Sequence, residues 1–366
     1  MTGASVAREI CFRILKKVDG GGYASDLLRR DTAALEPRDA ALAESMVFGC
    51  LRRRSQLDFL IAHFSGKPPG KLDPEVRIAL HMGIYQLRYL DRIPAHAAVK
   101  ESVELVKMAR KRSAAGFVNA VLRKVNRDPL EWPDRATGLS LPSWLLERWD
   151  RQYGPATATG IAQAALDEPV AYVQPDTGRQ HDIGAQSIVP LLRIETGMTV
   201  LDLCAAPGNK TAQALAAGGN VVACDRYFRR LKEVPQQAAR VVLDATKPLP
   251  FRAWSNSIVS HQGGFDRILL DAPCSGTGTL ARNPEIKWRL QAADLAAFAI
   301  EQRKMLAGAL GHLKPGGRLV YSTCSLEHEE NEGVVEGFPV QETYLRVPGR
   351  DPGDGFFAAV ITGVIA

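Results

Sequence analysis

Two hydrophobic periodicities divide the chain. In the first third, apolar residues recur at the three- and four-residue spacing of a buried helix face. The clearest runs are Val6, Ile10, Ile14 and Val18; Val76, Leu80, Ile84 and Leu87; Val99, Val103 and Val106; and Phe117, Val121 and Val125. No strand-like alternation interrupts these runs, so residues 1–127 are predicted to form an all-α domain of about six helices.

One helix start is marked by local signals. Asp73 precedes Pro74 and Glu75. An aspartate can cap the first turn, proline is tolerated at the first helical position, and a first-turn acid favours the positive end of the helix dipole. The pattern predicts a helix that begins at Pro74 with the Asp73 carboxylate as its cap.

Residues 128–181 are predicted to connect two larger parts of the chain. Prolines punctuate the beginning of this stretch, and an apolar stripe at helical spacing follows. The stripe consists of Trp144, Leu145, Leu146 and Trp149. Because large apolar side chains are more often buried than used as stacking platforms, we expect this stripe to pack against a neighbouring domain.

From about residue 197, short apolar strands alternate with helices. The predicted strands are 199–203, 221–225, 241–244, 265–270 and 317–322, with a long helix at 292–310. This alternation is typical of an α/β domain with a doubly wound parallel sheet. Residues 182–366 are therefore predicted to form a Rossmann-like domain.

Acidic residues mark the ends of four predicted strands, where ligands of such sheets bind. These acids are Asp202, Asp225, Asp244 and Asp271. The loop 204–211 matches neither the dinucleotide fingerprint nor the phosphate-binding loop. Asp225 follows Asp202 by about 20 residues, which suits a carboxylate on ribose hydroxyls. With a further acid for an adenine amino group, the pattern predicts S-adenosylmethionine as the ligand.

Composition narrows the class of protein. The chain has 366 residues, of which 46% are hydrophobic and 23% charged, as in globular proteins. No apolar run reaches the length of about 18 residues that a spanning helix needs, and no secretory signal is visible at the N-terminus, so we expect a cytoplasmic protein. No feature of the sequence demands more than a monomer.

The charge is distributed unevenly. Residues 1–127 hold 23 lysines and arginines against 13 aspartates and glutamates, whereas the other residues hold 23 against 27. A basic module joined to a mildly acidic one favours nucleic-acid binding by the basic part, although a solvated basic helix face would show the same charge.

Six cysteines stand at positions 11, 50, 204, 224, 274 and 324. They form no short pair and have no histidine partners nearby, so free thiols are expected and a metal site is not. Cys204 and Cys224 are interpreted as small buried hydrophobes. Cys274 and Cys324 follow the fourth and fifth predicted strands among Pro, Ser, Gly and Thr, so both thiols are expected over one crevice.

Several segments resemble known families. Phe48–Gly49, Gly83–Leu87, Ile93–Val99 and Gly116–Arg123 resemble NusB-like RNA-binding domains. In these segments His96 and Asn119 are interpreted individually as bridging or capping helices. Leu201–Thr211, Asp271–Trp288 and Val320–Glu332 resemble the motifs of RNA cytosine-C5 methyltransferases. The combination is similar to the RsmB (Sun/Fmu) type, which methylates bacterial 16S ribosomal RNA with S-adenosylmethionine.

The resemblance implies a role for each motif residue. In that family the Thr-Cys cysteine, here Cys324, is the nucleophile, and the Pro-Cys cysteine, here Cys274, assists breakdown of the adduct. Asp271 would hold the cytosine edge, with Lys210 beside it. The implied cofactor-binding residues are Cys204, Ala205, Ala206, Pro207, Gly208, Asn209, Lys210, Asp225, Asp244 and Asp271.

Two departures from the family qualify this expectation. Asn209 stands where the family usually has glycine, and asparagine tolerates a left-handed backbone better than most residues. The stretch 169–186 is shorter than the subdomain that related proteins carry there and that helps to hold RNA. A tRNA-directed enzyme of the same chemistry and a non-catalytic RNA-binding assembly factor therefore stay open as alternatives.

Overall fold

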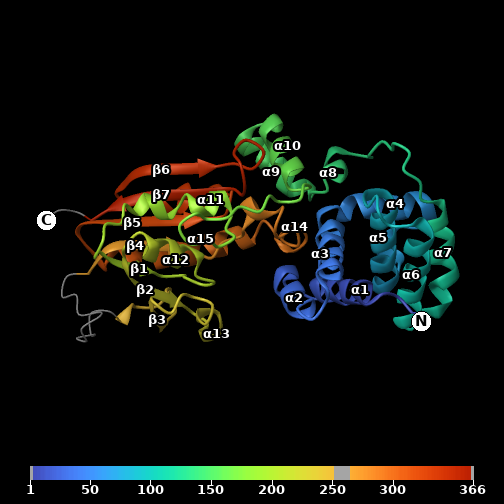
Figure 1. Cartoon of the computed structure of the whole chain (residues 1–366). Helices are drawn as coiled ribbons and strands as arrows, with labels where there is room; N and C mark the ends of the chain where they lie inside the picture. Colours follow the sequence, from blue (N-terminus) through green and yellow to red (C-terminus); the bar gives the residue numbers. More distant parts are fainter. Residues whose placement is uncertain (1–2, 251–263, 364–366) are drawn as a thin grey trace. The chain divides into compact units, whose positions relative to one another are not determined.

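The structure, a computed structural model, describes residues 3–250 and 264–363. The chain forms two compact units (Figure 1). The first comprises Met1–Asp167 and Leu280–Arg289, and the second Glu168–Thr279 and Leu290–Ala366. These units differ from the predicted boundaries, since residues 128–167 belong to the helical unit and a ten-residue segment of the second half joins it.

The first unit is all-α. Its helices up to residue 127 are α1 (Val6–Asp19), α2 (Ala24–Asp31), α3 (Pro37–Arg52), α4 (Arg54–Ser65), α5 (Pro74–Tyr89), α6 (Ala95–Met108) and α7 (Ala115–Lys124). Within residues 3–127 these are seven α-helices, where the sequence predicted about six. Their apolar faces meet in one core that extends from Ala7 to Leu122.

Two details of the predicted helices need correction. Val6 is the first residue of α1 and its side chain is 58% exposed, whereas Ile10 lies in the core. The helix α5 does begin at Pro74, but the Asp73 side chain makes no capping hydrogen bond. It pairs instead with the ammonium group of Lys111 at 2.9 Å, because an ion pair competes with the cap for the carboxylate.

Nearly half of the predicted connecting stretch, residues 128–181, is helical. It contains α8 (Arg135–Gly138), α9 (Ser143–Tyr153) and α10 (Pro155–Ala164). Leu145, Leu146 and Trp149 on α9 are buried, while Trp144 is half-buried. The apolar stripe is thus mostly interior.

The second unit is built on a seven-stranded sheet. The strands are β1 (Thr199–Asp202), β2 (Asn220–Asp225), β3 (Ala239–Val242), β4 (Phe265–Asp271), β5 (Leu313–Thr323), β6 (Val340–Arg346) and β7 (Phe356–Thr362), in the order β3-β2-β1-β4-β5-β7-β6. The first five pair in parallel, and β7 pairs antiparallel with both β5 and β6. The Rossmann-like fold is confirmed as a mixed sheet, and β3 begins and ends two residues earlier than predicted.

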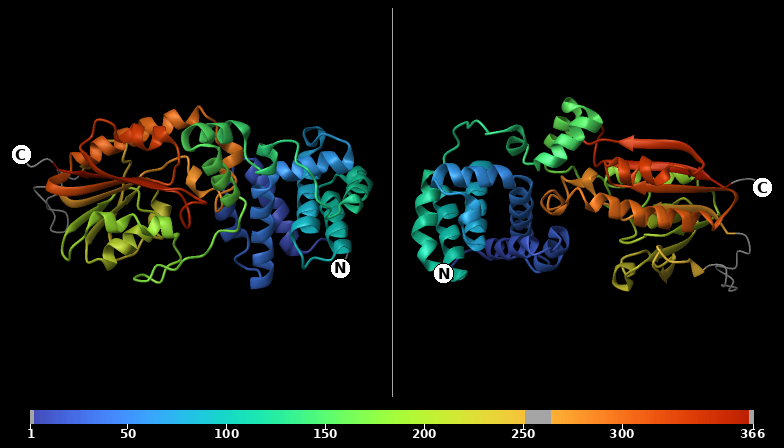
Figure 2. Two further views of the ribbon diagram at one scale, coloured as in Figure 1. Left: turned by 90° about the horizontal axis from the view of Figure 1, so that it is seen from above. Right: turned by 180° about the vertical axis from the view of Figure 1, so that it is seen from behind.

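Helices cover both faces of this sheet. On one face, α15 (Asp294–Leu310) packs against the apolar side chains of β1, β4 and β5. On the other face lie α12 (Asn209–Ala216) and α13 (Phe228–Leu231) together with α11 (Ile183–Gln186). Figure 2 shows α15 and α12 on opposite sides of the sheet. This arrangement leaves the carboxyl ends of the parallel strands free for a site.

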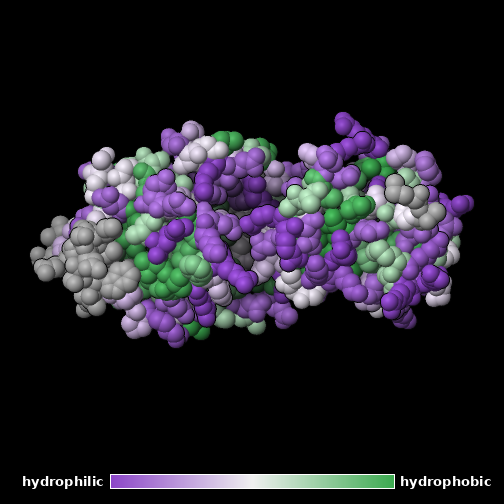
Figure 3. Space-filling view, turned by 60° about the horizontal axis from the view of Figure 1, so that its bottom comes forward, coloured by the Kyte–Doolittle hydropathy of each residue, from purple (hydrophilic) through white to green (hydrophobic). Residues whose placement is uncertain are grey.

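The surface is mainly polar. On the face shown in Figure 3, hydrophilic side chains surround separate hydrophobic patches. Among residues 3–250 and 264–363, no helix combines the length and apolarity needed to cross a membrane.

Candidate active site

Asp271 is held in place from two sides at the end of β4. Its Oδ2 lies 2.6 Å from Nζ of Lys210, which stands in the first turn of α12. Its Oδ1 accepts a hydrogen bond of 2.7 Å from the hydroxyl of Ser322, its register partner on β5. Both oxygens are therefore engaged, and the carboxylate has a fixed orientation at the mouth of the site.

The two predicted thiols lie together. The sulfurs of Cys274 and Cys324 are 3.4 Å apart, as expected for residues that follow neighbouring parallel strands. The hydrogen bond with Cys324, burial, and the nearby Glu330 and Asp271 carboxylates raise the pKa of Cys274. This environment favours a proton on the sulfur of Cys274.

The loop after β1 turns at a glycine. Gly208 has a φ of +100°, and a Cβ there would lie 2.7 Å from the Cα of Val234. Asn209 follows as the first residue of α12 and is not left-handed. The tolerance of asparagine for a left-handed backbone is therefore not needed at this position. Its Oδ1 instead accepts a hydrogen bond of 3.1 Å from Nη1 of Arg179.

Asp225 and Asp244 lie at the same edge of the sheet. Asp225, at the end of β2, is buried and accepts a 2.9 Å hydrogen bond from the backbone of Tyr227. Asp244 lies two residues beyond β3 and accepts hydrogen bonds from the Thr246 hydroxyl at 2.6 Å and backbone at 3.0 Å. These bonds lower the pKa of Asp244. Both carboxylates can accept hydrogen bonds from a nucleoside.

Asp202 has an unused acceptor. Its side chain is 1% exposed, and Oδ2 accepts a 2.7 Å hydrogen bond from the hydroxyl of Thr211. Its Oδ1 has no hydrogen-bond partner among the described residues. Burial raises the pKa of Asp202 to about 7. A buried acceptor without a donor fits a ligand that brings one, such as the amino group of S-adenosylmethionine.

Sequence reasoning missed two arginines at this edge. Nη2 of Arg230 donates to the carbonyl oxygen of Ala206 at 3.0 Å, and Nη1 lies 3.4 Å from Asp225. Arg179 reaches the same loop from the turn that closes at the Val173–Gln180 bridge. Arg230 follows the second strand closely enough to have been suspected, whereas nothing in the sequence pointed to Arg179.

The second unit contains two further cysteines. Cys224 is buried and Cys204 half-buried, and burial raises the pKa of both thiols. Within the part of the chain that the structure describes, no group of three or more His, Cys, Asp or Glu residues could hold a metal ion.

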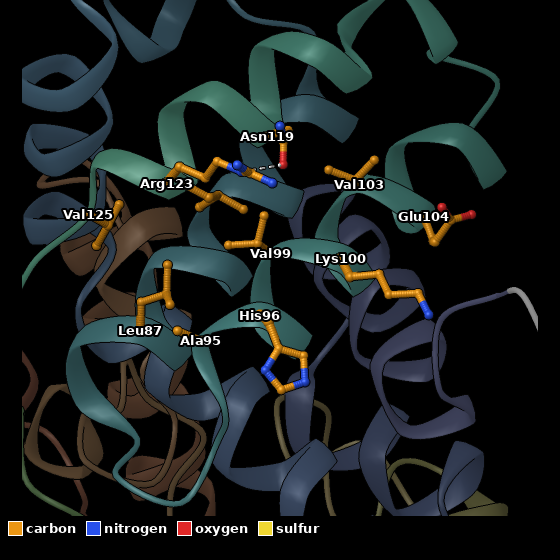
Figure 4. A pocket seen from close by; sticks show the side chains of 11 residues that line it. Leu87, Ala95, His96, Val99, Lys100, Val103, Glu104, Asn119, Arg123 and Val125 are labelled. Atoms are coloured by element: carbon orange, nitrogen blue, oxygen red, sulfur yellow. Dashed lines mark hydrogen bonds between the residues drawn. The ribbon is translucent and has the colours of Figure 1, made fainter.

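The helical unit carries a groove of about 780 Å³ between α6 and α7 (Figure 4). Val99 and Leu122 are part of its apolar lining, and His96, Lys100 and Arg123 add polar and basic groups. Oδ1 of Asn119 accepts a 3.3 Å hydrogen bond from Nε of Arg123, one turn further along α7. The groove is thus lined by residues from Ile93–Val99 and Gly116–Arg123, two of the segments that resemble NusB-like domains.

Comparisons with known proteins agree with this architecture. The family model for 16S rRNA methyltransferase RsmB/F matches residues 189–346, and the NusB family model matches residues 5–127. Ribosomal RNA small subunit methyltransferase B of Thermus thermophilus is 37% identical over an alignment of 375 positions. The alignment covers 94% of this chain and 89% of that protein. The protein of the same name from Shigella flexneri serotype 5b is 32% identical over an alignment of 409 positions, which covers 93% of this chain and 95% of that protein.

A solved structure has the same fold. The crystal structure of PH0851 matches with a TM-score of 0.75 over 97% of this chain and 98% of its own. The sequence identity is 19%, so this likeness concerns the fold alone.

Proposed function

Because the chain belongs to the 16S rRNA methyltransferase RsmB/F family and is an S-adenosylmethionine-dependent RNA methyltransferase, we propose that it methylates C5 of a cytosine in 16S rRNA. The observation that carries the proposal is the pair of sulfurs 3.4 Å apart, beside the oriented carboxylate of Asp271. A nucleophile with a second thiol next to it suits a reaction in which a covalent adduct must form and then break.

The two thiols divide this work. C5 of cytosine is a poor nucleophile, and addition of the Cys324 thiolate to C6 makes C5 enamine-like. The cofactor supplies a methyl group as an electrophile on its sulfonium sulfur. Once C5 carries the methyl group, the C5 proton passes to a base or to water, the C5–C6 double bond forms again, and the bond between Cys324 and C6 breaks to release the thiolate. Cys274 assists this release.

The strand-end residues hold the reactants. Asp271 binds the N3 and N4 edge of the cytosine and favours its protonated form during attack, and Lys210 keeps that carboxylate in position. Asp225, Asp244 and the loop 204–210 hold the cofactor. The free acceptor of Asp202 supports this assignment, because it is suited to the cofactor's amino group.

RNA is the macromolecular partner. The target base has to leave its stack to reach the thiols. The basic helical unit holds the surrounding RNA through phosphates and shape, and the groove beside Lys100 and Arg123 is one place for it. The chain acts as a monomer in the cytoplasm, on rRNA or on a partly assembled subunit.

Substitution of the two cysteines tests the chemistry. Cys324→Ala is expected to abolish methyl transfer to 16S rRNA, whereas Cys274→Ala should accumulate RNA bound covalently to Cys324 because release is slowed. Methylation is measured with a labelled methyl donor and the adduct by denaturing electrophoresis. Cys50→Ala, which changes a thiol in the helical core, serves as the control and should keep its activity. Activity in Cys324→Ala would overturn the nucleophile assignment.

The RNA target is tested separately. Bisulfite sequencing of rRNA and tRNA from a strain with and without the gene should reveal one 16S cytosine that loses its methyl group. Loss in tRNA would make this a tRNA enzyme. If the methylation of rRNA and tRNA is unchanged and calorimetry detects no binding of S-adenosylmethionine, the chain would be a non-catalytic assembly factor.

A further inference from the structure

Each of the two paired cysteines is followed by a buried serine, and both serines contact one carboxyl group. Ser275 follows Cys274 after β4, and Ser325 follows Cys324 after β5. The carboxyl group belongs to Glu330, whose side chain is fully buried. Nothing in the reaction described above uses this acid.

Glu330 accepts four hydrogen bonds. Oε1 accepts from the backbone N–H of Ser275 at 2.8 Å and from Nε2 of Gln302 at 3.0 Å. Oε2 accepts from the hydroxyl of Ser275 and, at 2.5 Å, from that of Ser325. A single side chain thus ties together two serines that stand 50 positions apart in the sequence.

Adjacent side chains hold the residues before and after the thiols. Asn331 accepts a 2.6 Å hydrogen bond from the hydroxyl of Thr323 and donates one of 3.0 Å to the carbonyl oxygen of Ser325. The Nε2 group of Gln302 that reaches the carboxyl group also donates to the carbonyl oxygen of Pro273 at 2.9 Å. The chain is therefore fixed on both sides of each cysteine.

A buried carboxyl group is a costly way to fill this space. Burial raises the pKa of Glu330, and the serine hydrogen bonds only partly oppose that effect. An apolar side chain of similar volume would avoid the cost of removing the carboxyl group from water. What an apolar side chain could not do is accept hydrogen bonds from both loops at once.

We propose that Glu330 is a positioning residue for methyl transfer. By binding Ser275 and Ser325 together, it holds the sulfurs of Cys274 and Cys324 at the separation that lets one add to the base and the other assist release. Glu330 does this through hydrogen bonds and does not touch the base. The inference rests on the proposed function, since it needs both thiols to act in one reaction.

Two substitutions at this position separate hydrogen bonding from charge. Glu330→Ala removes every acceptor and should lower kcat at least 100-fold, with KM for S-adenosylmethionine changed less than threefold. Glu330→Gln keeps an acceptor for the Ser275 N–H and an amide group that the serine hydroxyls can bind, so kcat should stay within about fivefold of wild type. Glu332→Ala alters an exposed acid two residues away and should have no effect.

Thermal melting, combined with the catalytic assay, distinguishes a positioning role of Glu330 from a simple loss of folded protein. We expect the folded fraction of Glu330→Ala at the assay temperature to match that of the active Gln variant. If Glu330→Ala keeps wild-type kcat, or if kcat falls only in proportion to the folded fraction, the positioning role is wrong.

The adduct provides a second readout. In the Cys274→Ala background, adding Glu330→Ala should slow covalent capture of RNA at least 30-fold while calorimetric binding of S-adenosylmethionine is retained. Equal capture rates would overturn the inference. Absence of any adduct in Cys274→Ala itself, together with activity in Cys324→Ala, would instead overturn the proposed function, so the two failures are distinct.

A double-mutant cycle completes the test. If Ser325 acts through Glu330, then Ser325→Ala combined with Glu330→Ala should lower kcat no further than Glu330→Ala alone. Independent, multiplying losses would show that the two residues do not act as one unit and would contradict the inference.

Discussion

Asp202 and Asp271 end neighbouring strands, but their surroundings give them different properties. Asp271 is half-buried and has a partner for each oxygen, the ammonium group of Lys210 and the hydroxyl of Ser322. Asp202 is buried with one hydroxyl partner, and burial raises its pKa to about 7. The carboxyl group of Asp202 therefore gains or loses its proton near neutral pH in the folded protein.

This difference predicts a pH dependence of stability. Since the pKa of Asp202 rises from 3.8 to about 7 on folding, the folded protein binds more protons than the unfolded chain between those values. The free energy of unfolding should fall by about 2–4 kcal/mol as pH rises from 4 to 7, relative to Asp202→Asn. Urea denaturation of the wild type and of Asp202→Asn at several pH values measures this difference in the free energy of unfolding. Parallel pH profiles of the two would refute the prediction.

At the scale of elements, the short segment after Cys274 has no room for larger residues. Gly278 lies in the 3-10 helix Thr277–Thr279, and its N–H donates to the carbonyl oxygen of Cys324 at 2.9 Å. A Cβ at this position would lie 2.4 Å from the carbonyl oxygen of Gly355. The loops of β4, β5 and β7 therefore approach one another at a glycine.

Gly278→Ala should consequently disturb the site. The added methyl group meets backbone atoms that cannot rotate away, so we expect a loss of about 1–3 kcal/mol in the free energy of unfolding and a lower kcat. Gly308→Ala on α15 is the matched control, because a Cβ at this position would meet nothing within 4 Å. This substitution should stabilise the helix by about 0.5–1 kcal/mol. Equal effects of the two changes would contradict this account.

At the scale of the whole molecule, the chain returns to the helical unit within the catalytic half. The segment Leu280–Arg289 belongs to that unit. The ammonium group of Lys287 is buried and donates to the carbonyl oxygens of Arg52 at 2.7 Å and Ser140 at 2.9 Å. Burial lowers the pKa of Lys287. The indole N–H of Trp288 donates to the carbonyl oxygen of Leu51 at 2.8 Å.

Lys287→Met should weaken this attachment. Two buried carbonyl oxygens lose their donor, which outweighs the relief of removing a buried ammonium group, so the free energy of unfolding should fall by about 1–3 kcal/mol. Lys304→Met, at an exposed position of α15, should change it by less than about 0.5 kcal/mol. Urea denaturation compares the two variants. A variant at Lys287 as stable as that control would show that the lysine contributes no net stability.

The sequence by itself determined the two fold classes and the positions of the motif residues. Helical periodicity up to residue 127 and strand–helix alternation after 197 are local patterns, because a buried face recurs at the period of its own element. Asp271, Cys274 and Cys324 were found because they lie at or just after the ends of predicted strands. The exact start of β3 and the partner of Asp73 depend on contacts outside the local pattern, and these were missed.

Only the tertiary structure decided how distant residues combine. Glu330 lies among other acids, Glu327, Glu329 and Glu332, and only the fold brings its buried carboxyl group to serines from two loops. The segment Leu280–Arg289 overlaps the motif Asp271–Trp288 of the second half, yet it folds with the helical unit. Neither result has a local signature, because burial and hydrogen-bond partners are set by which segments meet, and not by the order of residues within one segment.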